Sequence, residues 1–136
     1  MTRAVSLTDS YVHLLQRGNA EVLPRDGLGT TTPSDDTVTW DPSVAGLLVG
    51  EASMSESSRH GGERHLDSDE LVYLVSGAVR VCLETQGAEW TEVPLQAGSA
   101  VVVPQGVWHR LLVDEPSRML FLSGGRTEVR VRSQPR

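Results

Sequence analysis

The stretch ELVYLVSGAVRVCLE, residues Glu70–Glu84, consists of two β-rich runs. Apolar and polar residues alternate through its second half, which places Val79 and Val81 on one face, as in a half-buried β-strand. The pair Ser76-Gly77 interrupts the run with two residues that are typical of turns. The stretch therefore predicts two strands joined as a hairpin.

Similar short runs lie on both sides of this stretch. Gly, Pro, Asp and Ser separate them at frequent intervals, which is typical of an antiparallel barrel or sandwich. We predict Asp26–Asp36 as a polar loop, while Thr8–Arg17 fits either a short helix or a strand, of which we favour the strand. The further strands we expect are Val44–Met54, Trp90–Leu95, Ala100–Val103, Val107–Val113, Arg118–Ser123 and Thr127–Arg132.

Length and composition favour one folded domain. The chain has 136 residues, of which 38% are hydrophobic and 22% charged. This length suffices for one core of ordinary size and is short for two. We therefore expect a single domain over residues 1–136, with a core barrel at about residues 38–132 and a strand and loop extension at residues 1–37.

Charge and cysteine content exclude several classes of partner. The formal net charge is −6, which repels nucleic acid. No segment approaches the roughly 20 apolar residues that cross a bilayer, so we expect no membrane partner. The lone Cys82 cannot form an internal disulfide, and the first residues lack the pattern of a signal peptide. We therefore expect a cytoplasmic protein.

The candidate site residues are His and Glu side chains at suggestive spacings. Glu63 and His65 are two positions apart, so on a strand both side chains share one face. Glu70 begins the first of the two β-rich runs, and His109 follows a turn at Pro104–Gly106. Facing strands of a barrel would bring His109 close to the other three inside the barrel.

These residues lie in two segments that resemble the motifs of the cupins, small β-barrels whose motifs line a metal site. The second cupin motif is Gly-x5-Pro-x-Gly-x2-His, and the usual closing Asn is replaced here by Val113. In the first motif Glu63 stands in place of the usual first His, and Ser57 in place of the leading Gly. The matching residues are Glu63-x-His65-x4-Glu70-x6-Gly77 and Gly98-x5-Pro104-x-Gly106-x2-His109.

The resemblance implies an all-β fold, a single antiparallel double-stranded β-helix or jelly-roll barrel. It also implies one divalent metal ion, with four ligands that are Glu63, His65, Glu70 and His109. Two imidazoles and two carboxylates give a near-neutral metal site and leave two octahedral positions for water, substrate or dioxygen. Such a donor set suits Fe(II) and also accepts Mn(II), Ni(II) or Zn(II).

We therefore predict a metal-dependent cupin that acts on a small, partly apolar organic molecule, as a dioxygenase, an isomerase or a lyase. Glu63 or Glu70, if released from the metal, is the candidate catalytic base. The alternative is a non-catalytic cupin that binds a small molecule, or an accessory subunit. Apolar residues predicted to line the cavity are Val72, Leu74, Val101, Val103, Leu111 and Val113.

One alternative concerns the ligand set, and one further prediction concerns the assembly. His60 could replace Glu63 as a ligand, although Gly61-Gly62 after it favours a flexible loop. We also predict a homodimer, because an open antiparallel edge needs covering. The candidate contact is the strand around Tyr11–Leu15.

Overall fold

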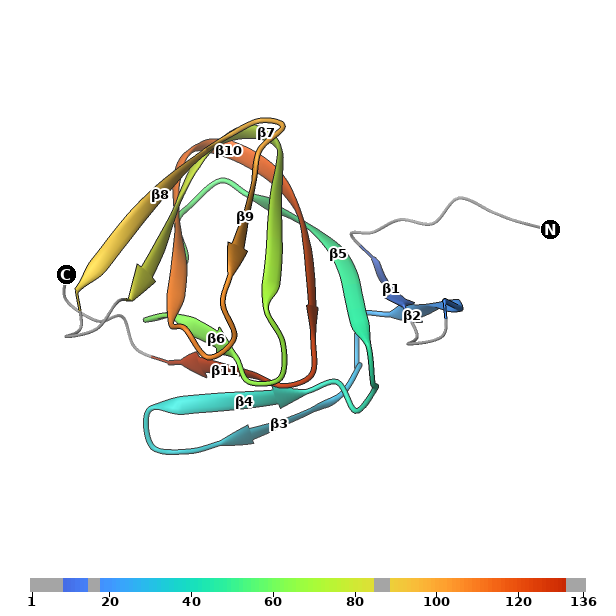
Figure 1. The fold of residues 1–136 in the computed structure, drawn as a ribbon. Helices are drawn as coiled ribbons and strands as arrows, with labels where there is room; N and C mark the ends of the chain where they lie inside the picture. Colours follow the sequence, from blue (N-terminus) through green and yellow to red (C-terminus); the bar gives the residue numbers. More distant parts are fainter. Residues whose placement is uncertain (1–8, 15–17, 85–88, 132–136) are drawn as a thin grey trace.

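The computed structural model describes residues 9–14, 18–84 and 89–131. Within these ranges every regular element is a β-strand, and the strands form one antiparallel sheet that curls into a barrel (Figure 1). The all-β, antiparallel jelly-roll expectation is confirmed. The strands are β1 (Ser10–Leu14), β2 (Ala20–Pro24), β3 (Thr30–Pro33), β4 (Thr37–Asp41), β5 (Leu47–Met54), β6 (Glu63–His65), β7 (Glu70–Glu84), β8 (Trp90–Gln96), β9 (Ala100–Val103), β10 (His109–Gly124) and β11 (Thr127–Arg130).

Residues Glu70–Glu84 form one strand, β7, so the hairpin predicted at Ser76-Gly77 is wrong. β7 pairs with β10 along its length, while its other edge pairs first with β9 and then with β8. Gly77 lies where that edge changes partner and has φ of +97°. A Cβ atom there would lie 2.5 Å from the carbonyl oxygen of Pro116. Glycine thus permits a bend beside β10 in place of a chain reversal.

β10 is likewise one strand where the sequence predicted two. Its register against β7 shifts between Val113 and Met119, which is the segment that faces the bend at Gly77. Irregularities of this kind bend a strand without ending its ladder of hydrogen bonds. The polar residues of this segment, which suggested a turn between two strands, therefore lie in a bulge.

The predicted polar loop Asp26–Asp36 also contains a strand. β3 pairs with β4 as a hairpin, which lies along the lower side of the barrel in Figure 1. All four residues of β3 are exposed, so they carry no apolar alternation that would reveal a strand in the sequence. β2 was not predicted either, since it has only five residues and ends at a proline.

The expected strand near the N-terminus is present as β1. It pairs with β2 on one edge and with β5 on the other, so both of its edges are used within this chain. Leu15 and the other residues up to Arg17 lie outside the described part of the chain. The homodimer stays a prediction, and a contact through an open edge of β1 is not available in this arrangement.

The core fills the end of the barrel between β7, β8, β9 and β10. Leu74 and Val81 on β7 have no exposed surface, which fits the alternation that the sequence showed. The buried core residues are Val72, Leu74, Val79, Val81, Leu95, Val103 and Met119.

In the part of the chain that the structure describes, no helix has the length and apolar character needed to cross a membrane.

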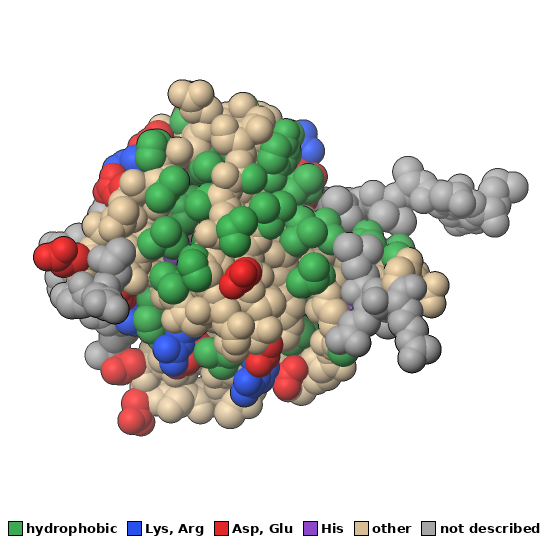
Figure 2. Space-filling model, in the orientation of Figure 1, with side chains coloured by type: hydrophobic (Ala, Val, Ile, Leu, Met, Phe, Trp, Pro, Cys, Tyr) green, Lys and Arg blue, Asp and Glu red, His purple; other side chains and the backbone are tan. Residues whose placement is uncertain are grey.

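The outer face of the sheet is also apolar in one row. Strand register aligns a single residue from each of six neighbouring strands, and side chains directly opposite one another share a face. Figure 2 shows hydrophobic side chains gathered on the face that carries β9 and β7. The outer apolar row consists of Val22, Val12, Val49, Leu122, Leu71 and Val102.

Candidate metal centre

The two segments that carry the motifs dock against each other. The backbone N–H of Gly106 donates to the carbonyl oxygen of His65 at 2.8 Å. The backbone N–H of Gln105 donates to Oδ1 of Asp69, also at 2.8 Å. The turn before β10 is thereby fastened to the loop between β6 and β7, which carry the remaining candidate ligands.

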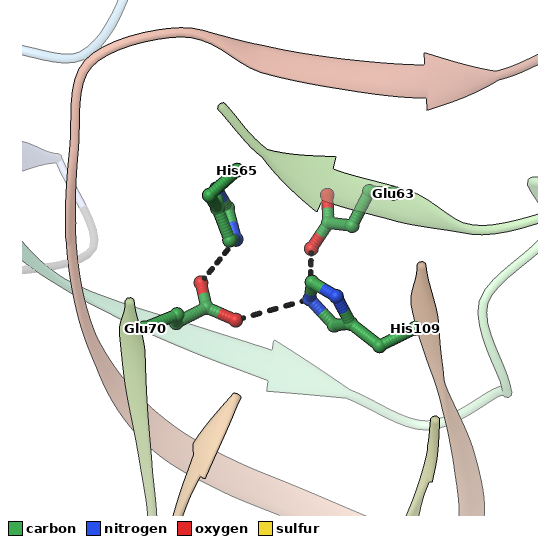
Figure 3. A group of neighbouring side chains, drawn as sticks. All are labelled: Glu63, His65, Glu70 and His109. Carbon is green, nitrogen blue, oxygen red and sulfur yellow. Dashed lines mark hydrogen bonds and ion pairs between the residues drawn. The ribbon is translucent and has the colours of Figure 1, made fainter. Parts of the chain in front are cut away.

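Strand register then brings the four predicted site residues together. His109, the first residue of β10, lies opposite Glu63 on β6. Glu70 is the first residue of β7, and its side chain points inward with that of His65 (Figure 3). One nitrogen or oxygen atom from each of these four residues lies within 4.8 Å of the others. The structure confirms that these side chains converge, while their roles as ligands or catalytic groups stay predictions.

Glu70 lies at the centre of this cluster. Its Oε2 atom is 2.9 Å from Nε2 of His65, and its Oε1 atom is 3.2 Å from Nε2 of His109. Nε2 of His109 is also 3.5 Å from Oε1 of Glu63. Glu63 is the most accessible member, since 31% of its side chain is exposed, compared with 7% for Glu70.

The backbone fixes a proton on Nδ1 of His109. Its Nδ1 atom lies 3.0 Å from the carbonyl oxygen of Val107. A carbonyl oxygen only accepts hydrogen bonds, so Nδ1 carries the proton and donates it. In the neutral imidazole the lone pair is then on Nε2, which faces the two glutamates. This is the arrangement in which histidine binds a metal ion.

His65 is arranged in a similar way by a side chain. Its Nδ1 atom lies 2.9 Å from Oγ1 of Thr127, the residue opposite it on β11. Its Nε2 atom is buried and has no hydrogen-bond partner in the described part of the chain, although Glu70 is close. Oε2 of Glu70 lies 2.9 Å from Nε2, but the contact is not directed as a hydrogen bond. A buried nitrogen of this kind requires an explanation, and a metal ion would supply one.

The charges in the cluster are strongly interdependent. Burial by itself would raise the pKa of Glu70, but its contacts with His109 and His65 outweigh burial and lower the pKa to about 2. Burial would lower the pKa of His109, but Glu63 and Glu70 outweigh it and raise the pKa to about 10. The protein without metal therefore holds a buried positive charge on His109 between carboxylates. The carboxylates of Glu63 and Glu70, which favour this positive charge, would also favour a metal cation between them.

The donor set and spacing fit a divalent transition-metal ion. Metal bonds of about 2.0–2.2 Å place neighbouring ligand atoms roughly 3–4 Å apart, close to the contacts in the cluster. Two imidazole nitrogens and carboxylate oxygens are the mixed set that Fe(II), Mn(II), Ni(II) and Zn(II) accept. These four residues are therefore able to hold a metal ion. Their chemistry does not select one of these four metals.

The cluster lies at one side of a cavity of about 360 Å³. His60 lines this cavity, but the structure places Glu63 and not His60 in the four-residue cluster. The Nδ1 atom of His60 accepts a hydrogen bond from the backbone N–H of Gly62 at 3.0 Å, so its proton resides on Nε2. Burial lowers the pKa of His60, which favours a neutral imidazole beside the cluster.

The predicted cavity lining is correct only in part. Val72 and Leu111 line the cavity, but the other predicted residues fill or pack against the core instead. The interior of a small barrel is filled by side chains, so an inward direction does not by itself place a residue at a cavity. The residues that do not line the cavity are Leu74, Val101, Val103 and Val113.

Several residues around the site carry no signal in the sequence. Thr127 holds His65, but its role depends on the register of β11 against β6, which no local pattern encodes. Tyr11 and Phe121 line the cavity from β1 and β10. Period-two alternation assigns such residues to a strand face and does not say which distant strands share a cavity.

A family model described as a cupin domain matches residues 51–123, more than half of the chain. The chain belongs to the cupin family. It is 28% identical over 80 residues to an acireductone dioxygenase of Phaeosphaeria nodorum, a match that covers 59% of this cupin and 43% of that protein. It is 33% identical over 54 residues to an acireductone dioxygenase of Branchiostoma floridae, with 39% of this cupin and 30% of that protein covered.

These matches span less than half the length of the curated relatives. Among solved structures, the cupin resembles Pac13, described as a nucleoside dehydratase, with a TM-score of 0.52 and 15% sequence identity. That superposition covers 77% of this chain and 88% of Pac13. At this identity the likeness concerns the fold alone.

Proposed function

We propose that this cupin is a non-haem iron-dependent dioxygenase that acts on a small, partly apolar molecule inside the barrel. The observation that carries the proposal is the convergence of His65, Glu70 and His109 with both histidine Nδ1 atoms engaged elsewhere. Two histidines and one carboxylate with open positions are the set used by non-haem Fe(II) oxygenases. The acireductone dioxygenases to which the chain is similar support the same reaction class.

Glu70, His109 and Glu63 have different roles in the proposed reaction. A bound Fe(II) ion would supply open positions for substrate oxygen atoms and for dioxygen, together with the redox chemistry. Glu70 and His109 are almost fully buried, so they hold their positions and exclude water from one side. Glu63 is the more accessible carboxylate and is the proposed base that accepts a proton from the substrate.

The charge of the site narrows the substrates that it would favour. Two carboxylates offset the charge of a divalent ion, so the loaded site is close to neutral. A near-neutral site attracts anions less than the positive site formed by three histidines and one glutamate. We therefore propose a substrate that arrives uncharged and binds through oxygen atoms, with Glu63 available to accept its proton.

Oxygen uptake tests the proposed reaction. The Fe(II)-loaded protein should consume dioxygen with a panel of uncharged enediols, catechols and hydroxyketones, and Glu70→Gln should abolish this uptake. Glu115→Gln, which changes an exposed carboxylate on β10, is the matched control and should leave uptake unchanged. Iron that is bound without oxygen uptake would contradict the dioxygenase. Product formation without oxygen would then support an isomerase or lyase, and binding alone a non-catalytic cupin.

A further inference from the structure

Three aromatic side chains form one wall of the cavity that contains the metal cluster. Tyr11, Trp40 and Phe121 come from β1, β4 and β10, and all three line the cavity. The ring centroid of Tyr11 lies 6.2 Å from that of Trp40 and 6.1 Å from that of Phe121. The rings are tilted against one another by 41° and 75°, as in ordinary aromatic contacts. We name these three residues the aromatic wall.

The aromatic wall depends on a glycine in the strand beneath it. A Cβ atom at Gly50 on β5 would lie 2.6 Å from Cζ of Phe121 and 3.0 Å from Cδ1 of Tyr11. The contact with Phe121 is shorter than carbon atoms tolerate, and the contact with Tyr11 is tight enough that its ring would have to shift. The two rings therefore lie in or against the space that a side chain at Gly50 would take. The missing side chain therefore lets both rings lie against the backbone of β5.

The rings are not packed away in the core. All three side chains are only partly buried, whereas Leu74 and Val81 in the core have no exposed surface. Trp40 is fixed by its indole N–H, which donates to the carbonyl oxygen of Leu28 at 2.9 Å. The aromatic wall thus exposes a rigid apolar surface to a ligand in the cavity.

Strand register connects the aromatic wall to the metal cluster. Trp40 lies opposite Thr127, and Thr127 lies opposite His65, so all three are aligned across β4, β11 and β6. Phe121 lies opposite Val72, which is two residues along β7 from Glu70 and on the same face. A molecule of a few rings can therefore contact the wall and the cluster together in the cavity of about 360 Å³.

Charge in and behind the cavity limits what the aromatic wall accepts. Among the described residues that line the cavity none is Arg, and two are glutamates, so away from the metal an anionic group meets no guanidinium there. The guanidinium of Arg25 lies 4.8 Å from the ring centroid of Tyr11 and 5.6 Å from that of Phe121. Because this cation already engages two rings of the wall, a cationic ligand gains little from them.

We propose that the aromatic wall is a binding site for an uncharged, flat, conjugated group of the substrate, whose oxygen donors reach the cluster. This inference rests on the proposed metal centre, and it adds the class of molecule that the centre takes. Stacking and burial of the conjugated group against the wall would contribute affinity. The oxygen donors at the other end of the substrate would fix its orientation at the cluster. The substrate is therefore an aromatic or conjugated molecule without a charged substituent.

Two hydroxamic acids test the aromatic wall, because both bind metal ions through two oxygen atoms and only one carries a ring. We would titrate the Zn(II)-loaded protein with acetohydroxamic acid and benzohydroxamic acid by calorimetry, correcting for their affinities for free zinc. Benzohydroxamic acid should bind at least about tenfold more tightly, because its ring is buried against the wall. A carboxylate at the para position of its ring should remove this gain.

Variants of the wall assign the effect to these residues. Gly50→Ala pushes both rings into the cavity, and Phe121→Leu removes one ring while it keeps an apolar side chain. Both should abolish the tenfold preference and leave acetohydroxamic acid binding unchanged within about twofold. Ser53→Ala, an exposed position on the same strand, is the control and should keep the preference.

The outcomes separate the two proposals. Equal binding of the two hydroxamic acids, or a preference that survives in both variants, overturns the aromatic wall and leaves the metal centre standing. Failure of the protein to take up zinc, or zinc uptake without acetohydroxamic acid binding, overturns the metal centre on which the proposed function rests. If Gly50→Ala does not fold, Phe121→Leu decides the question alone.

Discussion

The Nδ1 atom of His109 lies 3.0 Å from the carbonyl oxygen of Val107, two residues earlier in the chain. This short loop therefore contributes both the histidine and the acceptor that orients it. The same arrangement leaves Nε2 of His109 to face Glu63 and Glu70. A bound metal ion must displace the proton that these carboxylates hold on that nitrogen.

Metal binding should therefore release a proton. Glu63 and Glu70 outweigh the effect of burial and raise the pKa of His109 to about 10, so the imidazole is protonated at about pH 7.5 in the metal-free protein. Affinity should fall by about tenfold for each unit by which the pH drops below that pKa. Calorimetry in buffers of different ionisation enthalpy should report about one proton released per ion. Zinc binding without a buffer-dependent enthalpy would contradict this account of His109.

Thr127 should act on metal affinity through His65. Thr127→Val keeps the shape of the side chain but removes the hydroxyl that bonds Nδ1 of His65. We expect metal affinity to fall by about 10–100-fold, as for other groups that orient a metal-binding histidine. Thr91→Val, at an exposed position on β8, is the matched control and should leave affinity unchanged. Equal affinities of both variants would show that this hydrogen bond does not orient His65.

Two glycines of similar backbone conformation should differ sharply in their tolerance of alanine. Gly77 has φ of +97° and Gly98 has φ of +90°, but only at Gly77 would a Cβ atom meet the facing strand. Gly98→Ala should lower the free energy of unfolding by about 1–2 kcal/mol through backbone strain alone. Gly77→Ala should cost at least about 2 kcal/mol more, because β7 and β10 must also move apart. Denaturant unfolding of both variants measures the difference, and equal losses would contradict the close approach at Gly77.

The outer apolar row gives the predicted homodimer a surface. Val22 and Val102, at its two ends, are 50% and 55% exposed, and an exposed apolar patch of this kind marks an interaction surface in many proteins. If two copies pair through this row, Val102→Glu should convert a dimer to a monomer at micromolar concentration. Glu115→Gln, away from the row, should not. Sedimentation that shows a monomer of the unchanged protein would contradict the dimer.

The sequence was most informative where chemistry and spacing coincide. Glu63, His65, Glu70 and His109 were predicted as a group, and their side chains converge. The alternation of β7 also identified its buried face, including Val79 and Val81. Both predictions rest on local periodicity and on motif residues whose spacing along the chain fixes their place on a strand.

The sequence was least informative where structure depends on distant partners. Ser76-Gly77 has the composition of a turn, but pairing with β10 on one edge keeps β7 continuous. The aromatic wall is another such case, because Tyr11 and Trp40 are separated from Phe121 by most of the chain. Their proximity follows from the order of strands in the sheet, and that order is not encoded in any single segment.

The metal content of the protein, purified without chelator, decides whether the four converging side chains hold a metal ion. Elemental analysis should find about one equivalent of a divalent transition metal per chain, with iron favoured by the donor set. His109→Ala should lose the metal, whereas Glu63→Ala should keep it with weaker affinity, because His65, Glu70 and His109 remain and only a neighbouring negative charge is lost. Absence of metal from the purified protein, with none gained on anaerobic reconstitution with Fe(II), Mn(II), Ni(II) or Zn(II), would contradict the account.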